Sequence, residues 1–282
     1  MAVKLSVIYL AAGQSRRMGK PKLNLELADG VTLGSLALHA LSVNASSTAG
    51  LPDAVIPTAA HSGCTAGSSV LSAGAPSVNS LSDLIIVARP DDDMRWLPSI
   101  YRNGIYSCQT NTYPQLGVKL HKSVSYMGDI DAELLLPQYA SVRIIRCPDA
   151  HLGMSHSIRS GLAAAAEGQP DAVLIALADQ PFIPHRHIEM LIEAFNDSGA
   201  HFAATANREG IAMPPAIFGR RLFPALERLE GDAGARKLLS DASNAGVFVP
   251  ALKDEWLMDI DDPDSFKLAA DLYSKSMQIP DS

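Results

Sequence analysis

Short, almost uninterrupted apolar runs alternate with amphipathic stretches along this chain, and that alternation most restricts its fold. The apolar runs are Leu5–Leu10, Leu84–Ala88, Val142–Ile145 and Ala172–Ala178. Continuous apolar character over so few residues is typical of parallel strands covered on both faces. The amphipathic stretches predict helices at Thr32–Leu41, Ser157–Ala166, Pro184–Asn196, Arg220–Leu229 and Asp264–Tyr273. The sequence therefore predicts an α/β fold with a doubly wound, mostly parallel sheet, whose ligands bind beyond the carboxyl ends of the strands.

Two segments interrupt the alternation. Ser42–Ser82 is rich in Ser, Ala, Gly and Pro and has almost no charge, and Asn103–Gln138 is rich in Tyr, Gly and polar residues. Both are too long for ordinary connections between a helix and a strand. We therefore predict a single domain over residues 1–282 with two long surface insertions, at about 42–82 and 103–138.

Composition restricts the partners. The net charge is −7, and no basic stripe is visible, so we expect no nucleic-acid binding. No apolar stretch approaches the roughly 20 residues of a membrane span. The apolar run Leu5–Ala12 is short for a signal peptide, and Arg16 and Arg17 follow it rather than precede it. We expect a cytoplasmic protein.

The cysteines and histidines give no metal-binding pattern. No CxxC pair is present among Cys64, Cys108 and Cys147, so neither a disulfide framework nor a zinc site is indicated. The pairs His61/Cys64 and His185/His187 are each more often incidental than metal ligands.

The loop after the first strand has the chemistry of a phosphate site. Small residues at Ala11, Ala12 and Gly13 let the backbone approach a ligand closely, and successive N–H groups can form an anion nest. Arg17 and Lys22 add positive charge. The spacing is neither that of a P-loop nor that of the dinucleotide fingerprint, so a basic surface turn fits the spacing as well.

The order of residues in this loop resembles the signature of the MobA-like nucleotidyltransferases, which include molybdenum cofactor cytidylyl- and guanylyltransferases. The resemblance implies a Rossmann-like nucleotidyltransferase fold and roles for Arg17 and Lys22 in catalysis. It also implies nucleotide binding by Leu10, Ala11, Ala12, Gly13, Ser15, Arg17, Met18, Gly19 and Lys22.

A second motif begins at Gly153 and is similar to the family's Gly-Met-x-x-Ser-Leu-x-x-Gly. The resemblance implies that Gly153 and Ser157 contact the base, and it leaves the role of His156 open. From the residues alone, Ser155 or Ser157 can instead cap the helix that starts here.

Two aspartate motifs point to a metal site. Asp179 ends a buried strand and suits either a metal ligand at the sheet edge or a turn before Pro181. Its surroundings resemble the family's Leu-Ala-Asp-x-Pro, which implies a catalytic Asp179 that binds Mg²⁺ on the triphosphate. The segment from Asp259 resembles Asp-Ile-Asp-Thr-Pro, which implies a second metal ligand at Asp261, with Asp259 as the alternative. Asp262 should cap the next helix.

The segment Leu229–Arg236 resembles the family's Leu-x-Gly-Asp-x-Gly-Ala-Arg and implies acceptor binding by Asp232 and Arg236. Arg236 suits a bidentate contact with a phosphate, whereas Asp232 is equally a candidate helix cap. Pro214–Phe218 is similar to a Pro-Val-x-Phe segment, and we expect a turn leading into a short strand.

The resemblance implies a Mg²⁺-dependent enzyme that moves CMP from CTP to the terminal phosphate of molybdopterin and releases pyrophosphate. Ala11-Ala12-Gly13 is similar to the cytidylyl form of the loop, since the guanylyl form tends to carry Gly-Gly. The alternatives are transfer from GTP, another phosphorylated acceptor, or a non-catalytic maturation factor that serves a molybdenum-enzyme apo-protein. Two close carboxylates repel each other. We therefore expect that Asp179→Asn and Asp261→Asn do not lower stability. We expect each change to lower turnover, because it removes a charge from the implied metal site.

Overall fold

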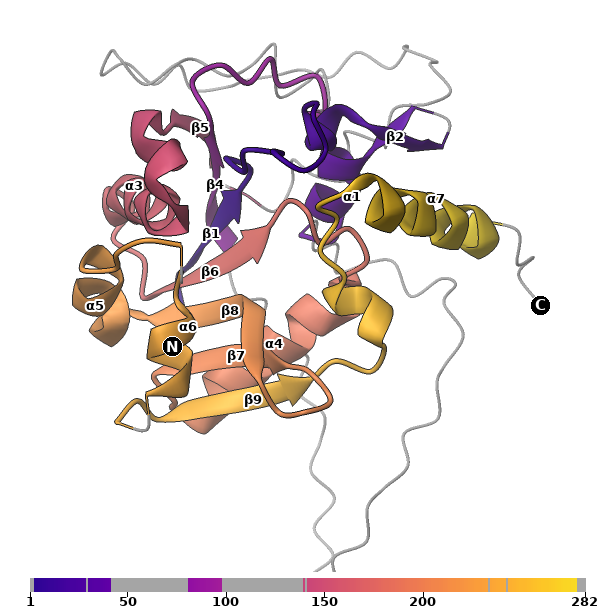
Figure 1. Ribbon diagram of the computed structural model, residues 1–282. Coiled ribbons are helices and arrows are strands. Elements are labelled where there is room, and N and C mark those ends of the chain that lie inside the picture. Colours follow the sequence, from indigo (N-terminus) through magenta and orange to yellow (C-terminus); the bar gives the residue numbers. More distant parts are fainter. Residues whose placement is uncertain are drawn as a thin grey trace, which may run out of the picture.

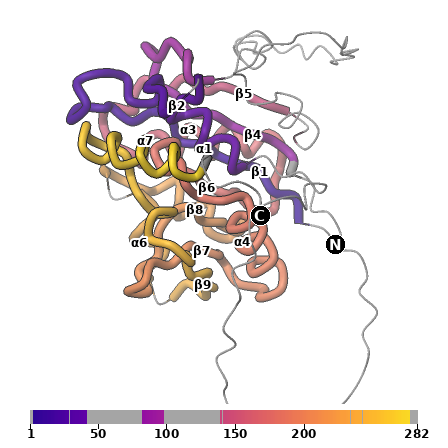
Figure 2. Tube along the Cα trace, turned by 90° about the vertical axis from the view of Figure 1, so that its right-hand side faces the viewer, coloured from indigo at the N-terminus to yellow at the C-terminus, as the bar shows by residue number. Residues whose placement is uncertain are grey.

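The four apolar runs form the parallel part of one sheet. The computed structural model of the chain describes residues 3–28, 30–41, 81–97, 139, 141–232, 234–241 and 243–277. Within these ranges, seven strands pair in the order β5-β4-β1-β6-β8-β7-β9 (Figure 2). The strands are β1 Leu5–Leu10, β4 Leu81–Ala88, β5 Ser141–Arg146, β6 Ala172–Leu177, β7 Phe202–Ala206, β8 Ala212–Gly219 and β9 Gly246–Pro250. Only β8 runs antiparallel to its neighbours in this sheet, so the predicted mostly parallel α/β fold is confirmed.

Helices cover both faces of the sheet (Figure 1). One face packs against α1, α4 and α7, and the other against α3, α5 and α6. Their bounds are α1 Leu33–His39, α3 Met154–Ala166, α4 His185–Ser198, α5 Phe223–Glu227, α6 Arg236–Ser240 and α7 Pro263–Met277. Short 3₁₀ helices lie at Lys22–Asn24, Pro148–Leu152, Arg220–Leu222 and Asp254–Leu257, and β2 Glu26–Ala28 pairs with β3 Val31–Thr32.

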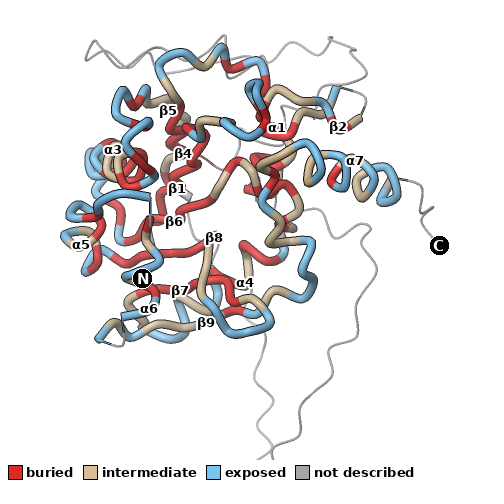
Figure 3. Tube along the Cα trace, in the orientation of Figure 1, coloured by how far each residue is buried: buried red, intermediate tan, exposed pale blue. Residues whose placement is uncertain are grey.

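Strand β1 shows why the apolar runs are nearly continuous. All six of its residues are buried, and alternate side chains enter the two separate cores on either face. Figure 3 shows β1, β4 and β6 as the buried centre of the molecule. A strand with apolar surroundings on both faces needs apolar residues at successive positions rather than at alternate ones.

Strand β4 begins at Leu81, three residues before the predicted start at Leu84, so the first predicted insertion ends too late. The sequence hid this because Ser82 and Asp83 are polar. In the structure the Ser82 hydroxyl lies 2.8 Å from that of Ser6, and Asp83 accepts a hydrogen bond from Ser141. Residues 42–80 and 103–138, which hold the rest of both predicted insertions, lie outside the described ranges.

Three predictions about helices and their N-caps need correction. Helix α3 starts at Met154 with Gly153 as its N-cap, so the predicted cap by Ser155 or Ser157 is wrong. Helix α6 has Ala235 as its N-cap, so Asp232 is not a cap. The predicted helix Arg220–Leu229 is a 3₁₀ turn followed by the short α5, with Pro224 in its first turn.

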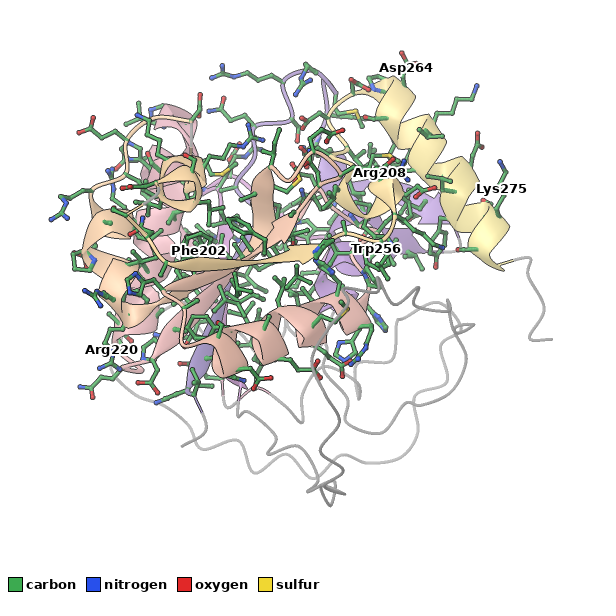
Figure 4. The ribbon with its side chains drawn as sticks, turned by 90° about the horizontal axis from the view of Figure 1, so that it is seen from below. Phe202, Arg208, Arg220, Trp256, Asp264 and Lys275 are labelled. Atoms are coloured by element: carbon green, nitrogen blue, oxygen red, sulfur yellow. The ribbon has the colours of Figure 1, made fainter. Side chains whose placement is uncertain are left out.

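The C-terminal helix starts as predicted. The Ser265 backbone N–H donates to Asp262 Oδ1 at 2.8 Å, which makes Asp262 the N-cap of α7. Asp264 in the first turn and Lys275 in the last turn lie toward opposite ends of this helix (Figure 4). Both charges complement the helix dipole. This start fixes the position of the preceding residue, Asp261.

Candidate nucleotide-binding site

The carboxyl ends of β1 and β6 lie side by side, and the chain turns away from them in opposite directions across the sheet. Strand β1 pairs with β4 on one side and with β6 on the other. Such a switch point is where open α/β sheets bind ligands. The loop after β1 and the turn after β6, which holds Asp179, both start there.

The loop after β1 is folded by its own backbone and by Ser15. Ser15 adopts a left-handed conformation with φ 50°, and its carbonyl accepts hydrogen bonds from Met18 and Gly19. The Ser15 hydroxyl accepts the Lys22 backbone N–H at 3.2 Å. Met18 is buried, so it anchors the loop to the protein. Ser15 and Met18 therefore shape the loop rather than line its pocket.

Lys22 lies between the two aspartates. Its Nζ donates to Asp179 Oδ2 at 2.8 Å and to Asp261 Oδ1 at 2.6 Å, and its side chain is only 5% exposed. Burial lowers the pKa of Lys22, but the Asp179 charge and the hydrogen bonds to both carboxylates outweigh it, so the pKa is raised overall. Arg17 Nη2 also donates to Asp261, at 2.5 Å. Residues that are more than 150 positions apart in sequence thus form one charge cluster.

Asp259 lies outside this cluster of ion pairs. Its Oδ1 accepts a hydrogen bond from Gln180 Nε2 at 2.9 Å. Partial burial raises the pKa of Asp259, and the negative charge of Asp179 adds to the effect. The Ile260 N–H donates to the Asp179 carbonyl at 3.0 Å and ties the two segments together. Of the two alternatives, it is Asp261 that the structure places with Lys22 and Asp179.

A pocket of about 280 Å³ adjoins the cluster at Asp179. Among the residues predicted for the nucleotide, Leu10, Ala12, Gly13, Gly153 and Ser157 line it. Ala11 instead packs into the core on the face of the sheet that α1 covers. Asp232, predicted for the acceptor, lines the same pocket, whereas its predicted companion Arg236 does not.

The pocket also contains residues that the sequence reasoning missed. They are Gln14, Arg16, Ala150, His151, Met154 and Leu177. Arg16 Nε donates to Gln14 Oε1 at 2.7 Å, so it lies on the pocket side while Arg17 turns toward Asp261. The adjacent arginines Arg16 and Arg17 indicated a basic loop, but their spacing does not tell which of them faces the pocket and which pairs with Asp261.

The arrangement suits a polyanionic ligand with a divalent cation. Two carboxylates share one cationic group, and carboxylate oxygens are the ligands that Mg²⁺ prefers. Among the described residues no group of three or more His, Cys, Asp or Glu side chains is placed to hold a metal. Mg²⁺ commonly takes only one or two protein carboxylates and completes its shell with phosphates and water, so the pair fits.

The switch-point pocket, the basic loop and the paired carboxylates define an α/β protein of the nucleotide-binding class. Within it, residues 122–246 match the family model described as MobA-like NTP transferase domain. A curated relative, the purine catabolism protein PucB of Bacillus subtilis (strain 168), is 34% identical over 123 residues. That match covers 43% of this chain and 58% of the relative, which is less than two thirds of the relative's length.

Solved structures share the fold. Rv0371c of Mycobacterium tuberculosis H37Rv, in its complex with manganese, gives a TM-score of 0.52 at 16% identity, with 95% of this chain and 98% of that chain covered. Molybdopterin-guanine dinucleotide biosynthesis protein A of Archaeoglobus fulgidus gives 0.50 at 16% identity, with 96% and 99% covered. The family model and the relative agree with the resemblance of the sequence motifs to MobA-like nucleotidyltransferases, and the solved structures share the fold.

In the described part of the chain, no helix is long and apolar enough to cross a membrane.

Proposed function

We propose that this protein is a nucleotidyltransferase that moves CMP from CTP to the terminal phosphate of a molybdopterin-type cofactor. The observation that carries the proposal is the convergence of Asp179 and Asp261 on Lys22 beside the pocket. An oxygen of the acceptor phosphate attacks the α-phosphorus in line, the bond to the β-phosphate oxygen breaks, and pyrophosphate leaves. No side-chain nucleophile is needed.

Each part of the site has a task in this reaction. The transition state concentrates negative charge, so Arg16, Arg17, Lys22 and the N–H groups of the loop stabilise it. Asp179 and Asp261 are the residues that would hold Mg²⁺, which neutralises phosphate charge when bound. Reactions of this class commonly use a divalent cation, and the fold neighbour Rv0371c is solved with manganese. Lys22 holds the two carboxylates together before the substrate arrives.

The choice of CTP rests on Ala12. Of the two alanines in the loop, only Ala12 lines the pocket, where its methyl group narrows the space that a glycine would leave. A pyrimidine needs less room than a purine. The acceptor rests on the resemblance of the loop to molybdenum cofactor cytidylyltransferases, and Arg236 remains our proposed contact for its phosphate. We also propose that the protein works in the cytoplasm, where nucleoside triphosphates are available.

A second candidate is a maturation factor that delivers a molybdopterin-type cofactor to an apo-enzyme without transferring a nucleotide. The relative PucB is named for purine catabolism, and that name states no nucleotide transfer. Divalent-metal-dependent release of pyrophosphate separates the two functions, because only the transferase releases it.

The test measures pyrophosphate release with CTP and with GTP, together with the melting temperature of each nucleotide complex. CTP should give the faster release and the larger shift, since a ligand stabilises according to its concentration over its dissociation constant. An equal or larger effect of GTP would overturn the choice of base. Ala12→Gly should narrow the difference between the two nucleotides.

The same assay tests the carboxylates. Asp179→Asn and Asp261→Asn should each lower turnover by orders of magnitude, because each removes a charge from the proposed metal site. Asp259→Asn is the matched control and should stay near normal. If Asp261→Asn is near normal and Asp259→Asn is not, the second ligand is Asp259. Near-normal turnover in Asp179→Asn would remove the proposed metal site.

The ion pairs change one expectation drawn from the sequence. We expected no loss of stability in these variants, on the ground that the two carboxylates repel each other. In the structure Lys22 lies between the two carboxylates, and its side chain is almost fully buried. Both carboxylates therefore neutralise the buried positive charge of Lys22. We now expect a small drop in melting temperature for both variants.

A further inference from the structure

Asp232 reaches the pocket from a loop far along the chain. It follows α5, whereas the other pocket residues come from the end of β1 and its loop, from the 3₁₀ helix Pro148–Leu152 and the start of α3, and from the end of β6 and its turn. A side chain at Gly153 would bring its Cβ within 2.7 Å of Asp232 Oδ1 and 2.8 Å of the Gly231 carbonyl oxygen. The Asp232 carboxylate therefore lies directly against the Gly153 backbone.

Hydrogen bonds to α3 hold this loop in place. The Ser155 N–H donates to the Gly231 carbonyl at 3.2 Å, and Arg159 Nη1 donates to the Leu229 carbonyl at 2.6 Å. The Asp232 carboxylate itself makes no hydrogen bond or ion pair with any described residue. A positioned carboxylate without a protein partner is available to a ligand.

The chemistry of the pocket restricts what that carboxylate meets. An ionised carboxylate only accepts hydrogen bonds, and it repels phosphate. Among the pocket residues, Gly13 and Arg16 belong to the loop after β1 and Asp179 to the turn after β6, whereas Asp232 lies against Gly153 at the N-cap of α3. The donors of a cytidine nucleotide away from its phosphates are the exocyclic amino group and the ribose hydroxyls.

We infer that Asp232 accepts a hydrogen bond from the exocyclic amino group of the base and thereby selects cytosine over uracil. The inference rests on the proposed function, because it takes a pyrimidine nucleoside triphosphate as the ligand. Cytosine and uracil are nearly equal in size, so Ala12 does not distinguish them. They differ in that cytosine presents an amino donor where uracil presents a carbonyl acceptor, which the carboxylate repels.

The experiment compares wild type with Asp232→Asn, using CTP and UTP in both turnover and melting-temperature assays. Asparagine keeps the shape but also offers an N–H donor, which suits the uracil carbonyl. The preference for CTP over UTP, as a ratio of kcat/KM and as a ratio of dissociation constants, should fall at least about tenfold. Glu230→Gln neutralises a neighbouring exposed carboxylate that does not line the pocket. The preference of this variant for CTP over UTP should therefore equal that of wild type.

The outcomes separate this inference from the proposed function. An unchanged ratio in Asp232→Asn overturns the inference while leaving nucleotide transfer intact. A second contrary result is that Asp232→Asn weakens the binding of CTP and UTP equally, while 2′-deoxy-CTP binds weakly to wild type. That result assigns the carboxylate to the ribose and also overturns the inference. If wild type releases no pyrophosphate with any nucleotide, the proposed function fails, and the ratio of dissociation constants alone decides the role of Asp232.

Discussion

His187 is a fully buried histidine whose protonation state follows from its neighbours. Its Nε2 lies 2.9 Å from the Thr205 hydroxyl, and that hydroxyl donates its only hydrogen to the Pro215 carbonyl at 2.9 Å. Nε2 must therefore carry the proton. Nδ1 is then an unprotonated nitrogen with no hydrogen-bond partner among the described residues. Burial lowers the pKa of His187 to about 4.

This pKa predicts a loss of stability in acid. The unfolded chain binds the proton near pH 6.5, whereas the folded protein binds it only near pH 4, so stability is full above 6.5 and falls as the pH drops between these values. The loss is about 3 kcal/mol when complete. His187→Gln keeps a hydrogen-bond donor for Thr205. Its unfolding free energy, measured with denaturant, should fall much less between pH 7 and pH 4.5 than that of wild type. His201→Gln is the control at a half-exposed position. Equal acid sensitivity in wild type and His187→Gln would contradict the prediction.

At the scale of single residues, the sequence predicted which side chains gather but not how they pair. The small and basic residues after β1 indicated a phosphate site, although a basic surface turn fitted their spacing as well. The position of Lys22 between Asp179 and Asp261 was not predictable, because it depends on three segments that meet only in the folded chain. The placement of Asp232 in the nucleotide pocket has the same cause.

Helix α3 packs on the sheet through a glycine. A Cβ at Gly161 would come within 2.5 Å of Ile8 Cγ2 and 3.0 Å of Val87 Cγ2. Alanine is the better residue for a helix interior by about 1 kcal/mol. Here the steric conflict decides the sign of the stability change, because Ile8 and Val87 are both fully buried and cannot move freely.

Gly161→Ala should therefore lower the unfolding free energy by about 1–3 kcal/mol. Because α3 brings Met154 and Ser157 to the pocket, nucleotide affinity should fall as well. Ala163→Ser adds one heavy atom on the exposed face of the same helix and should change either quantity much less. The check is denaturant unfolding with nucleotide titration, and a stabilised Gly161→Ala would refute the packing argument.

At the scale of elements, the parallel strands were predictable and β7–β9 were not. Phe202–Ala206 contains mainly alanine and threonine, which give a weak strand signal. In β8, Pro214 and Pro215 argue against a strand, and the sequence indicated only a turn followed by a short one. The structure places both prolines where the β7–β8 register shifts between Ala204 and Thr205, so their missing N–H groups disturb no regular pairing.

At the scale of the whole molecule, the site joins parts of the chain that lie far apart. The family match covers residues 122–246, whereas the basic loop precedes it and Asp261 follows it. Strands β1, β4 and β5 come from three stretches separated by the two long segments, yet they are adjacent in one sheet. We therefore propose that residues 1–282 form a single domain.

The charge cluster at the strand ends has a consequence for how fast the nucleotide arrives. Arg17 and Lys22 balance Asp179 and Asp261, and the whole chain carries −7, so no long-range field draws an anion toward the site. Encounter should then depend on diffusion and short-range contacts. Raising the salt from about 20 to 200 mM should leave the association rate unchanged or slightly faster, because screening weakens the overall repulsion. Stopped-flow mixing measures this rate, and a steep fall with salt would reveal attractive steering. Balanced charge thus makes nucleotide capture insensitive to the ionic strength of the surroundings.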